Sequence, residues 1–139
     1  MLSYIKASFF MLFFIVICYL VVNSIDYFDI TSGCYIAITG DVLKGNEDTI
    51  RTALRNLKYE DSDSYNRVCG YVSKIIENTC LNSDPRFGYP KQMPDGCYIK
   101  GSKTIYLKPV EKNSDEVVTS RMEELKRLSE FSKEFWQEF

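Results

Sequence analysis

An uncharged apolar run over residues 7–25, placed between Lys6 and Asp26, constrains this chain more than any other feature. About 20 apolar residues cross a bilayer core as a helix, so the run is long enough for a membrane anchor. Lys6 precedes the run whereas Asp26 and Asp29 follow it, and this charge bias favours a cytoplasmic amino terminus. We therefore expect a single-pass membrane protein whose remaining chain lies outside the cytosol.

A cleavable secretory signal is the alternative interpretation of the same run. Its densest part, residues 9–22, has the length of a signal core, and the sequence tolerates cleavage after Ser24. We favour the anchor, because Tyr19, Leu20 and Val21 are bulky where a signal would become smaller and more polar. Cleavage would instead release a secreted domain.

Residues 1–25 are thus expected to form the anchor or signal, and residues 26–139 one extracytoplasmic domain. About 115 residues suffice for one compact core and not for two. Of the 17 basic residues in the chain only Lys6 precedes position 26, so the domain carries the other 16 against 19 acidic residues. This mild acidity argues against a nucleic-acid partner.

Four cysteines follow the apolar run: Cys34, Cys69, Cys80 and Cys97. An even number in a short exported domain predicts two disulfides. A helix that contained Cys69 and ended near Asn78 would separate Cys69 from Cys80 by about a dozen ångströms, too far for a bond. We favour Cys34 with Cys69 and Cys80 with Cys97, because the second bond would close a Pro-rich loop; Cys34 with Cys80 and Cys69 with Cys97 remains open. A metal site is not expected, because the chain has neither a Cys-x-x-Cys pair nor a histidine.

The first half of the domain predicts one strand and two helices. Residues 34–38 favour a strand, which Gly40 closes. An amphipathic helix capped by Asn46 follows, with apolar residues at helical spacing: Ile50, Ala53, Leu54 and Leu57. The acidic stretch 60–64 begins a second helix, whose apolar stripe is Tyr65, Val68, Cys69, Val72, Ile75 and Ile76.

The second half predicts a loop, a hairpin and a long helix. Residues 81–96 have no periodic pattern and contain three prolines, so we expect an irregular loop. Residues 96–100 and 103–107 flank a two-residue turn with Gly101 first. The last helix begins at Asn113 or Ser114, runs nearly to Phe139, and has an apolar side made of Val118, Met122, Leu125, Leu128, Phe135 and Trp136. The order β-α-α-β-β-α predicts a small, disulfide-stabilised α+β domain.

The absence of histidine from the sequence excludes the common catalytic constellations. It rules out Ser-His-Asp and Cys-His sites and histidine-bound zinc. Asp95, Glu123 and Glu124 could in principle supply a carboxylate pair, but their spacing does not select one, and we expect the two glutamates to pair with Lys126 and Arg127. The acidic stretch 60–64 is interpreted as helix capping, not as a calcium loop. No catalytic, cofactor or metal residue is assigned.

Two neighbouring segments are candidates for binding. Lys100 and Lys103 are expected to face each other at the hairpin tip, where a bound anion would relieve the repulsion between them. The loop combines positive charge with aromatic rings, a composition favoured in recognition surfaces. The candidate binding residues are therefore Arg86, Phe87, Tyr89, Lys91, Lys100 and Lys103. The alternative is a solvated turn and a loop that folds back onto the domain.

The last helix ends in four aromatic residues: Phe131, Phe135, Trp136 and Phe139. An aromatic stripe at helical spacing usually packs inward. If the helix is longer than the domain, Trp136 and Phe139 become exposed and available for self-association or for docking.

A strand ending in Ile105, Tyr106 and Leu107, followed by a long helix, resembles the layout of zincin-type metallopeptidases. In that family the helix carries His-Glu-x-x-His, whereas residues 117–124 here contain Glu123 and Glu124 but no histidine. The resemblance therefore implies at most a catalytically inactive relative, and no site residue follows from it.

These observations favour a non-enzymatic extracytoplasmic domain, anchored or secreted, that binds an unidentified protein or surface component without a cofactor. The alternative is a carboxylate-dependent hydrolase of envelope or extracellular polymers. A concave pocket that holds two acids, at least one of them with a raised pKa, would distinguish the second function from the first.

Overall fold

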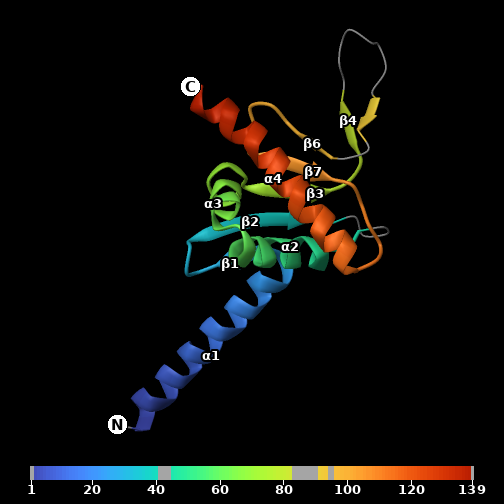
Figure 1. Cartoon of the computed structure of the whole chain (residues 1–139). Helices are drawn as coiled ribbons and strands as arrows, with labels where there is room; N and C mark the ends of the chain where they lie inside the picture. Colours follow the sequence, from blue (N-terminus) through green and yellow to red (C-terminus); the bar gives the residue numbers. More distant parts are fainter. Residues whose placement is uncertain (1, 41–44, 83–90, 94–95, 139) are drawn as a thin grey trace.

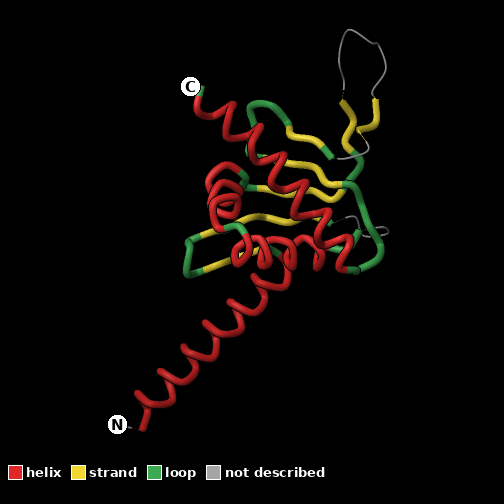
Figure 2. Tube along the Cα trace, in the orientation of Figure 1, coloured by secondary structure: helices red, strands yellow, loops and turns green. Residues whose placement is uncertain are grey.

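The computed structural model, which describes residues 2–40, 45–82, 91–93 and 96–138, has a five-stranded sheet covered on one face by three helices (Figures 1 and 2). The covering helices are α2 (Glu47–Glu60), α3 (Ser62–Tyr71) and α4 (Asp115–Gln137). A fourth helix, α1 (Leu2–Ile25), projects away from this two-layer domain (Figure 1). The predicted α+β class and the long C-terminal helix are confirmed.

The sheet has parallel strands at its centre and an antiparallel strand at each edge. Its order is β1-β2-β3-β7-β6. β2 pairs in parallel with β3, and β3 pairs in parallel with β7, whereas β1 and β6 run antiparallel to their neighbours. The strands are β1 (Tyr27–Asp29), β2 (Cys34–Thr39), β3 (Lys74–Glu77), β7 (Thr104–Leu107) and β6 (Cys97–Tyr98).

The central strand β3 corrects the sequence prediction, which had continued the second helix to Ile76. α3 ends at Tyr71, and the backbone of its C-cap Val72 is already extended, with φ −122° and ψ 123°. In β3 Ile75 and Glu77 are buried while Lys74 is exposed, the alternation of a strand. Short β-branched runs fit helical and strand patterns equally well, and here pairing with β2 and β7 selects the strand. Strand β1 was also missed, because it has only three residues.

A second, two-stranded sheet occupies part of the segment that was expected to be irregular throughout. β4 (Cys80–Asn82) pairs antiparallel with β5 (Lys91–Met93). Each strand has three residues, which is too short for any hydrophobic period to appear in the sequence.

The β6–β7 hairpin is confirmed, but its connection is longer than the predicted two-residue turn. Tyr98 pairs with Ile105 and the Ile99 amide donates to the Thr104 carbonyl, and a β-turn lies inside the loop between them. The Ser102 amide donates to the Ile99 carbonyl at 3.0 Å, which makes Lys100 and Gly101 the central residues of the turn. Gly101 has φ +83°, the conformation that a type II turn requires at its third position. Of the two central residues of this turn, the second, Gly101, is therefore the one that must be glycine.

The apolar faces of the sheet and helices meet in one core. Ile36, Ile75 and Ile105 of the central strands are fully buried against the helices. The four predicted apolar positions of α2 are also fully buried, and the Asn46 side chain accepts from the Asp48 amide, which confirms the predicted cap. The predicted apolar side of α4 is buried over its first four members: Val118, Met122, Leu125 and Leu128. Ser114 caps this helix.

The favoured disulfide pairing is confirmed. Cys34–Cys69 joins β2 to α3, with Cα atoms 5.3 Å apart, and Cys80–Cys97 joins β4 to β6, with Cα atoms 6.0 Å apart. The argument used to exclude Cys69–Cys80 assumed a helix reaching Asn78 and was wrong, although its conclusion holds. Disulfides persist in oxidising compartments, so the two bonds indicate an extracytoplasmic or secreted protein.

The α1 helix has large apolar side chains on every side, and between positions 9 and 21 they are 41–75 % exposed. The free cysteine Cys18 lies among them. None of the helices, as far as the structure describes them, combines the length and apolarity needed to cross a membrane. The anchor expected for residues 1–25 is therefore not supported.

Candidate functional site

A cleft of about 420 Å³ lies between the β6–β7 hairpin and the C-terminal half of α4. Tyr98 and Lys100 line it from the hairpin, and Arg127, Phe131 and Phe135 line it from the helix, together with Glu134 and Glu138. We call it the hairpin–helix cleft. It combines apolar aromatic rings with charges of both signs.

The helical wall of the cleft is a second face of α4, distinct from its core face. Arg127, Phe131, Glu134 and Glu138 recur at spacings of three and four residues, which places their side chains along one stripe. The opposite side of the helix is fixed to α3, where the Ser132 hydroxyl donates to the Tyr71 carbonyl at 2.6 Å. Packing against α3 therefore leaves the aromatic stripe turned toward the hairpin.

Gly96 allows the hairpin to approach closely. Its φ is +74°, and a Cβ at this position would collide with the Tyr106 carbonyl oxygen and touch the Leu128 side chain. Because neither the backbone conformation nor the space tolerates a larger residue, Gly96 sets the position of Cys97 and Tyr98 on the cleft wall.

The Tyr98 hydroxyl is buried and has no hydrogen-bond partner within the part of the chain that the structure describes. Buried polar atoms in proteins are nearly always hydrogen-bonded, so a side chain of this kind needs an explanation. Because Tyr98 lines the cleft, a ligand group is one natural partner for its hydroxyl.

The two hairpin lysines lie over aromatic rings of α4. The Lys100 Nζ is 5.9 Å from the ring centroid of Phe135, and the Lys103 Nζ is 5.7 Å from that of Trp136. Lys103 also donates to the Gly70 carbonyl at 3.3 Å. Each cation–π contact contributes about 0.5–1 kcal/mol at an exposed site. These contacts hold the hairpin tip against α4.

The terminal aromatic residues are not all in the core, as the default interpretation required. Phe131 is 48 % exposed and Trp136 is 39 % exposed, beside a half-buried Phe135. Trp136, placed by default on the buried side, is exposed as the alternative interpretation allowed, whereas Phe139 lies outside the described residues. α4 is therefore longer than its core contacts require.

The candidate binding loop is largely beyond the described part of the chain. Arg86, Phe87 and Tyr89 lie outside it, and Lys91 is the first residue of β5. The base of this segment is nevertheless joined to the cleft, because the disulfide from Cys80 ends on Cys97, which lines the cleft.

A polar cluster at the β1–β2 turn was not anticipated from the sequence. The Asp29 carboxylate forms an ion pair with Lys58 at 2.6 Å and accepts hydrogen bonds from the hydroxyls of Thr31, Ser32 and Tyr65. Burial alone would raise the pKa of Asp29, but Lys58 and the hydroxyl donors outweigh it and hold that pKa well below its ordinary value.

The tyrosines of the same cluster stay protonated near neutral pH. Burial raises the pKa of Tyr65, and it also raises the pKa of Tyr27, whose hydroxyl lies 3.0 Å from that of Tyr65. An ionised carboxylate beside neutral phenols has no group poised to exchange a proton at neutral pH. The cluster fixes the turn between β1 and β2.

A buried ion pair between Glu77 and Arg121 was also missed, because Glu77 had been placed near the end of a helix. The Arg121 Nη2 lies 2.7 Å from the Glu77 Oε1 and also donates to the Lys108 carbonyl. The Val110 amide donates to the same carboxylate. Burial raises the pKa of Glu77, against the lowering effects of Val110 and Arg121. Glu77 does not line the hairpin–helix cleft.

The remaining candidate acids that the structure describes take part in ion pairs or cap a helix, as expected from the sequence. Glu123 pairs with Lys126 at 3.6 Å, and Glu124 pairs with Arg121. Asp61 caps α3 by accepting from the Ser64 amide, and Asp95 lies outside the described residues. Among the residues that the structure describes, no group of three or more His, Cys, Asp or Glu could hold a metal ion.

Of the cleft residues, sequence reasoning singled out Lys100, Phe131 and Phe135 and missed Tyr98, Arg127 and Glu134. The second stripe of α4 could have been found from its spacing, whereas Tyr98 could be placed only by the strand register. Comparison with known proteins identified no matching family model, no similar curated protein and no similar solved structure.

Proposed function

We propose that this chain is an extracytoplasmic binding domain that captures a protein segment in the hairpin–helix cleft. The cleft supports this function by its composition: exposed Phe131 and half-buried Phe135 give apolar contact, and the Tyr98 hydroxyl still lacks a partner among the described residues. Aromatic and arginine side chains carry much of the binding energy in protein interfaces. The open cleft with the exposed Phe131 ring is the observation on which the proposal depends.

The charges of the cleft favour a protein partner over a nucleic acid. The lining contains two cations, Lys100 and Arg127, and two carboxylates, Glu134 and Glu138. A polyanion would meet both carboxylates, whereas a peptide can offer groups of either sign. A second copy of this chain is one such partner, because α4 exposes Trp136 next to the cleft.

A hydrolytic function has less support. It needs two acids in one pocket with at least one raised pKa. Glu77, whose pKa is raised by burial, is bonded to Arg121 inside the core. Asp29, which lines a different cavity, has a lowered pKa. No observation favours the hydrolase over the binding domain.

We also propose that α1 is retained as a membrane tether, with lipid around its apolar side chains. Its described side chains are apolar all round and exposed, and a helix of this kind is stable when protein or lipid surrounds it. The domain does not supply that surrounding, because α1 projects away from it (Figure 1). An exported chain meets a lipid bilayer, which can surround α1.

A photo-crosslinking amino acid at Phe131 in the full chain, expressed in its own envelope, tests the binding function. We expect one discrete protein adduct, mapped to one segment of the partner, and its loss when Trp136→Ser is added. An adduct between two copies of the chain would identify a second copy as the partner. The control places the crosslinker at Tyr35, which is 51 % exposed on β2. No adduct at Phe131, or the same adducts from both positions, would disprove the proposal.

A further inference from the structure

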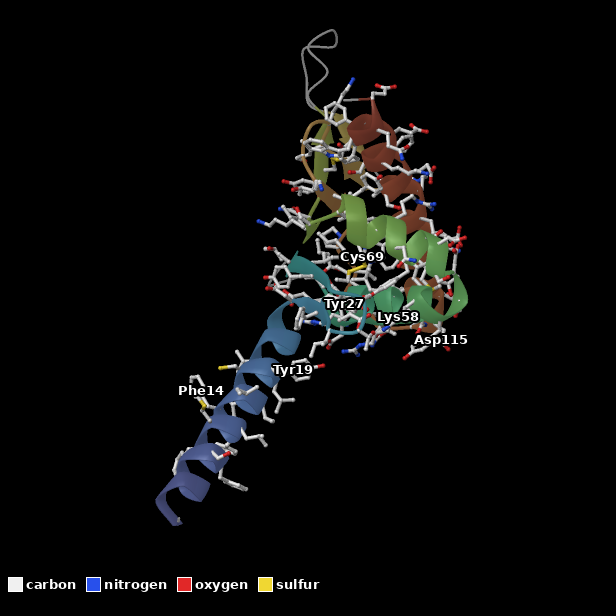
Figure 3. The ribbon with its side chains drawn as sticks, turned by 90° about the vertical axis from the view of Figure 1, so that its left-hand side faces the viewer. Phe14, Tyr19, Tyr27, Lys58, Cys69 and Asp115 are labelled. Carbon is white, nitrogen blue, oxygen red and sulfur yellow. A yellow bond between two sulfur atoms is a disulfide. The ribbon has the colours of Figure 1, made fainter. Side chains whose placement is uncertain are left out.

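A second cavity, of about 670 Å³, lies where α1 meets the domain. Tyr19 and Leu20 line it from the last turns of α1, Ile30 from the β1–β2 turn, and Arg55 and Tyr59 from α2. We call these five residues the α1 collar. Figure 3 shows Tyr19 on the side of α1 that faces Lys58, just below the domain.

The apolar part of the collar continues the apolar surface of α1. Leu20 is 57 % exposed, Ile30 is 64 % exposed and Tyr59 is 85 % exposed. An isolated soluble domain rarely leaves such side chains together in water. Tyrosine is also the residue, with tryptophan, that gathers where a membrane helix leaves the bilayer.

The charge of the collar is positive. Two cations, Arg55 and Lys58, line the cavity against one acid, Asp29. Lys58 is committed to Asp29 at 2.6 Å, so these two charges cancel. Arg55 is exposed and forms no ion pair with any residue that the structure describes. The guanidinium of Arg55 is therefore available to a ligand, next to the end of the apolar helix α1 that joins the domain.

A ligand for this surface needs an anionic head and an apolar tail. The guanidinium matches a phosphate with two parallel hydrogen bonds, and Tyr19 and Tyr59 can flank the head. Leu20 and the apolar side chains below it can contact a hydrocarbon chain that runs beside α1. A phospholipid has this combination, and a free phosphate does not.

We propose that the α1 collar binds the phosphate headgroup of a phospholipid whose acyl chains lie along α1. The inference rests on the retention of α1 in the proposed function, but not on the hairpin–helix cleft. The bound lipid would fix the orientation of the domain on the membrane. The C-terminal end of α1 would lie at the membrane surface, and the hairpin–helix cleft would lie at the end of the domain that points away from it.

Native mass spectrometry of the full chain, released from nanodiscs of phosphatidylglycerol and phosphatidylcholine in equal parts, tests this inference. We expect one phosphatidylglycerol to remain on each chain. Arg55→Glu should lower its retention about tenfold or more, as expected for loss of a charge-assisted hydrogen bond. Arg55→Lys should restore part of it. Lys112→Glu, which changes an equally exposed charge on the loop before α4, should leave retention unchanged.

Four results would overturn the inference. The first is equal retention by Arg55→Glu and the original chain, and the second is an equal loss with Lys112→Glu. The third is displacement of the lipid by inorganic phosphate at matched concentration, which would make the cavity a simple anion site. The fourth is a mature chain that begins after α1, because it would lack the collar. Failure of crosslinking at Phe131 leaves lipid retention unaffected, so the two proposals fail separately.

Discussion

The α1 collar lies where α1 joins the domain, and the hairpin–helix cleft lies beside the C-terminal half of α4. Figure 1 shows that these two elements meet the domain at opposite ends. The hairpin–helix cleft has charges of both signs, and two lysines hold its walls together over aromatic rings. The α1 collar has one cation, Arg55, without an ion pair to any described residue, beside exposed apolar side chains. The difference separates a surface suited to a peptide from a surface suited to an amphiphile with an anionic head.

Both clefts depend on the same folded domain. Its stability should be most sensitive to loss of the buried Glu77–Arg121 ion pair. Arg121→Ala should lower the free energy of unfolding by about 3–5 kcal/mol, because it leaves a carboxylate buried without its charge partner. Urea unfolding followed by circular dichroism measures this loss, and both clefts should lose function together. The double variant Glu77→Leu with Arg121→Met should recover most of the stability. A loss under about 1 kcal/mol for Arg121→Ala would contradict the buried pair.

Removal of one disulfide should affect the cleft at one end of the domain, and removal of the other disulfide should affect the cleft at the other end. Cys80→Ser with Cys97→Ser opens a loop of sequence separation 17 and should cost about 3 kcal/mol on chain-entropy grounds. Cys34→Ser with Cys69→Ser, at separation 35, should cost about 0.6 kcal/mol more.

Under conditions where both disulfide variants remain folded, their functional losses should differ. Removal of the Cys80–Cys97 bond should weaken crosslinking at Phe131, because Cys97 lines the hairpin–helix cleft. Removal of the Cys34–Cys69 bond should instead weaken lipid retention, because Cys34 begins β2 directly after the turn that holds Ile30. Equal effects of both variants on both readouts would contradict the separation.

Acid should destabilise the collar side through Asp29. The pKa of Asp29 is lower in the folded state than in the unfolded state. Its contribution to the free energy of unfolding is therefore complete above the unfolded-state pKa of about 4 and is lost progressively as the pH falls below that value. Asp29→Asn should therefore be less stable than the original chain at pH 7 and should lose less stability on acidification. Urea midpoints at several pH values measure both effects. Parallel pH profiles for the two proteins would contradict the assigned role of Asp29.

The smallest expected effect concerns the hairpin tip. Lys103→Gln removes one cation–π contact and should cost about 0.5–1 kcal/mol, measured by the urea midpoint. Lys103→Arg, which keeps the cation, should cost less. The collar should be unaffected, so lipid retention serves as the internal control. A stability change as large as that from the disulfides would mean that Lys103 has a further role.

The sequence was informative where one local signal agreed with the tertiary contacts. The predicted cap and buried face of α2, the start of α4 and the favoured cysteine pairing all follow from spacing and residue type, and all are confirmed. The helix signals are local, so they do not depend on the rest of the fold, whereas the cysteine pairing also needs the fold to bring distant elements together.

The sequence was least informative where pairing with distant strands decides the structure. Ile75 and Ile76 fit a helix stripe, and only their position between β2 and β7 makes them a strand. The collar could not be predicted for the same reason. Arg55 and Ile30 are far apart in the chain, and the junction of α1 with the sheet brings them to one cavity.

Photo-crosslinking from both ends of the same protein tests the central claim most directly. The crosslinker replaces Phe131 in one sample and the highly exposed Tyr59 in the other, each in the full chain in its native envelope. We predict a protein adduct from position 131 and a phospholipid adduct from position 59, identified by mass spectrometry. Adducts of the same class from both positions, or the reverse assignment, would contradict the account.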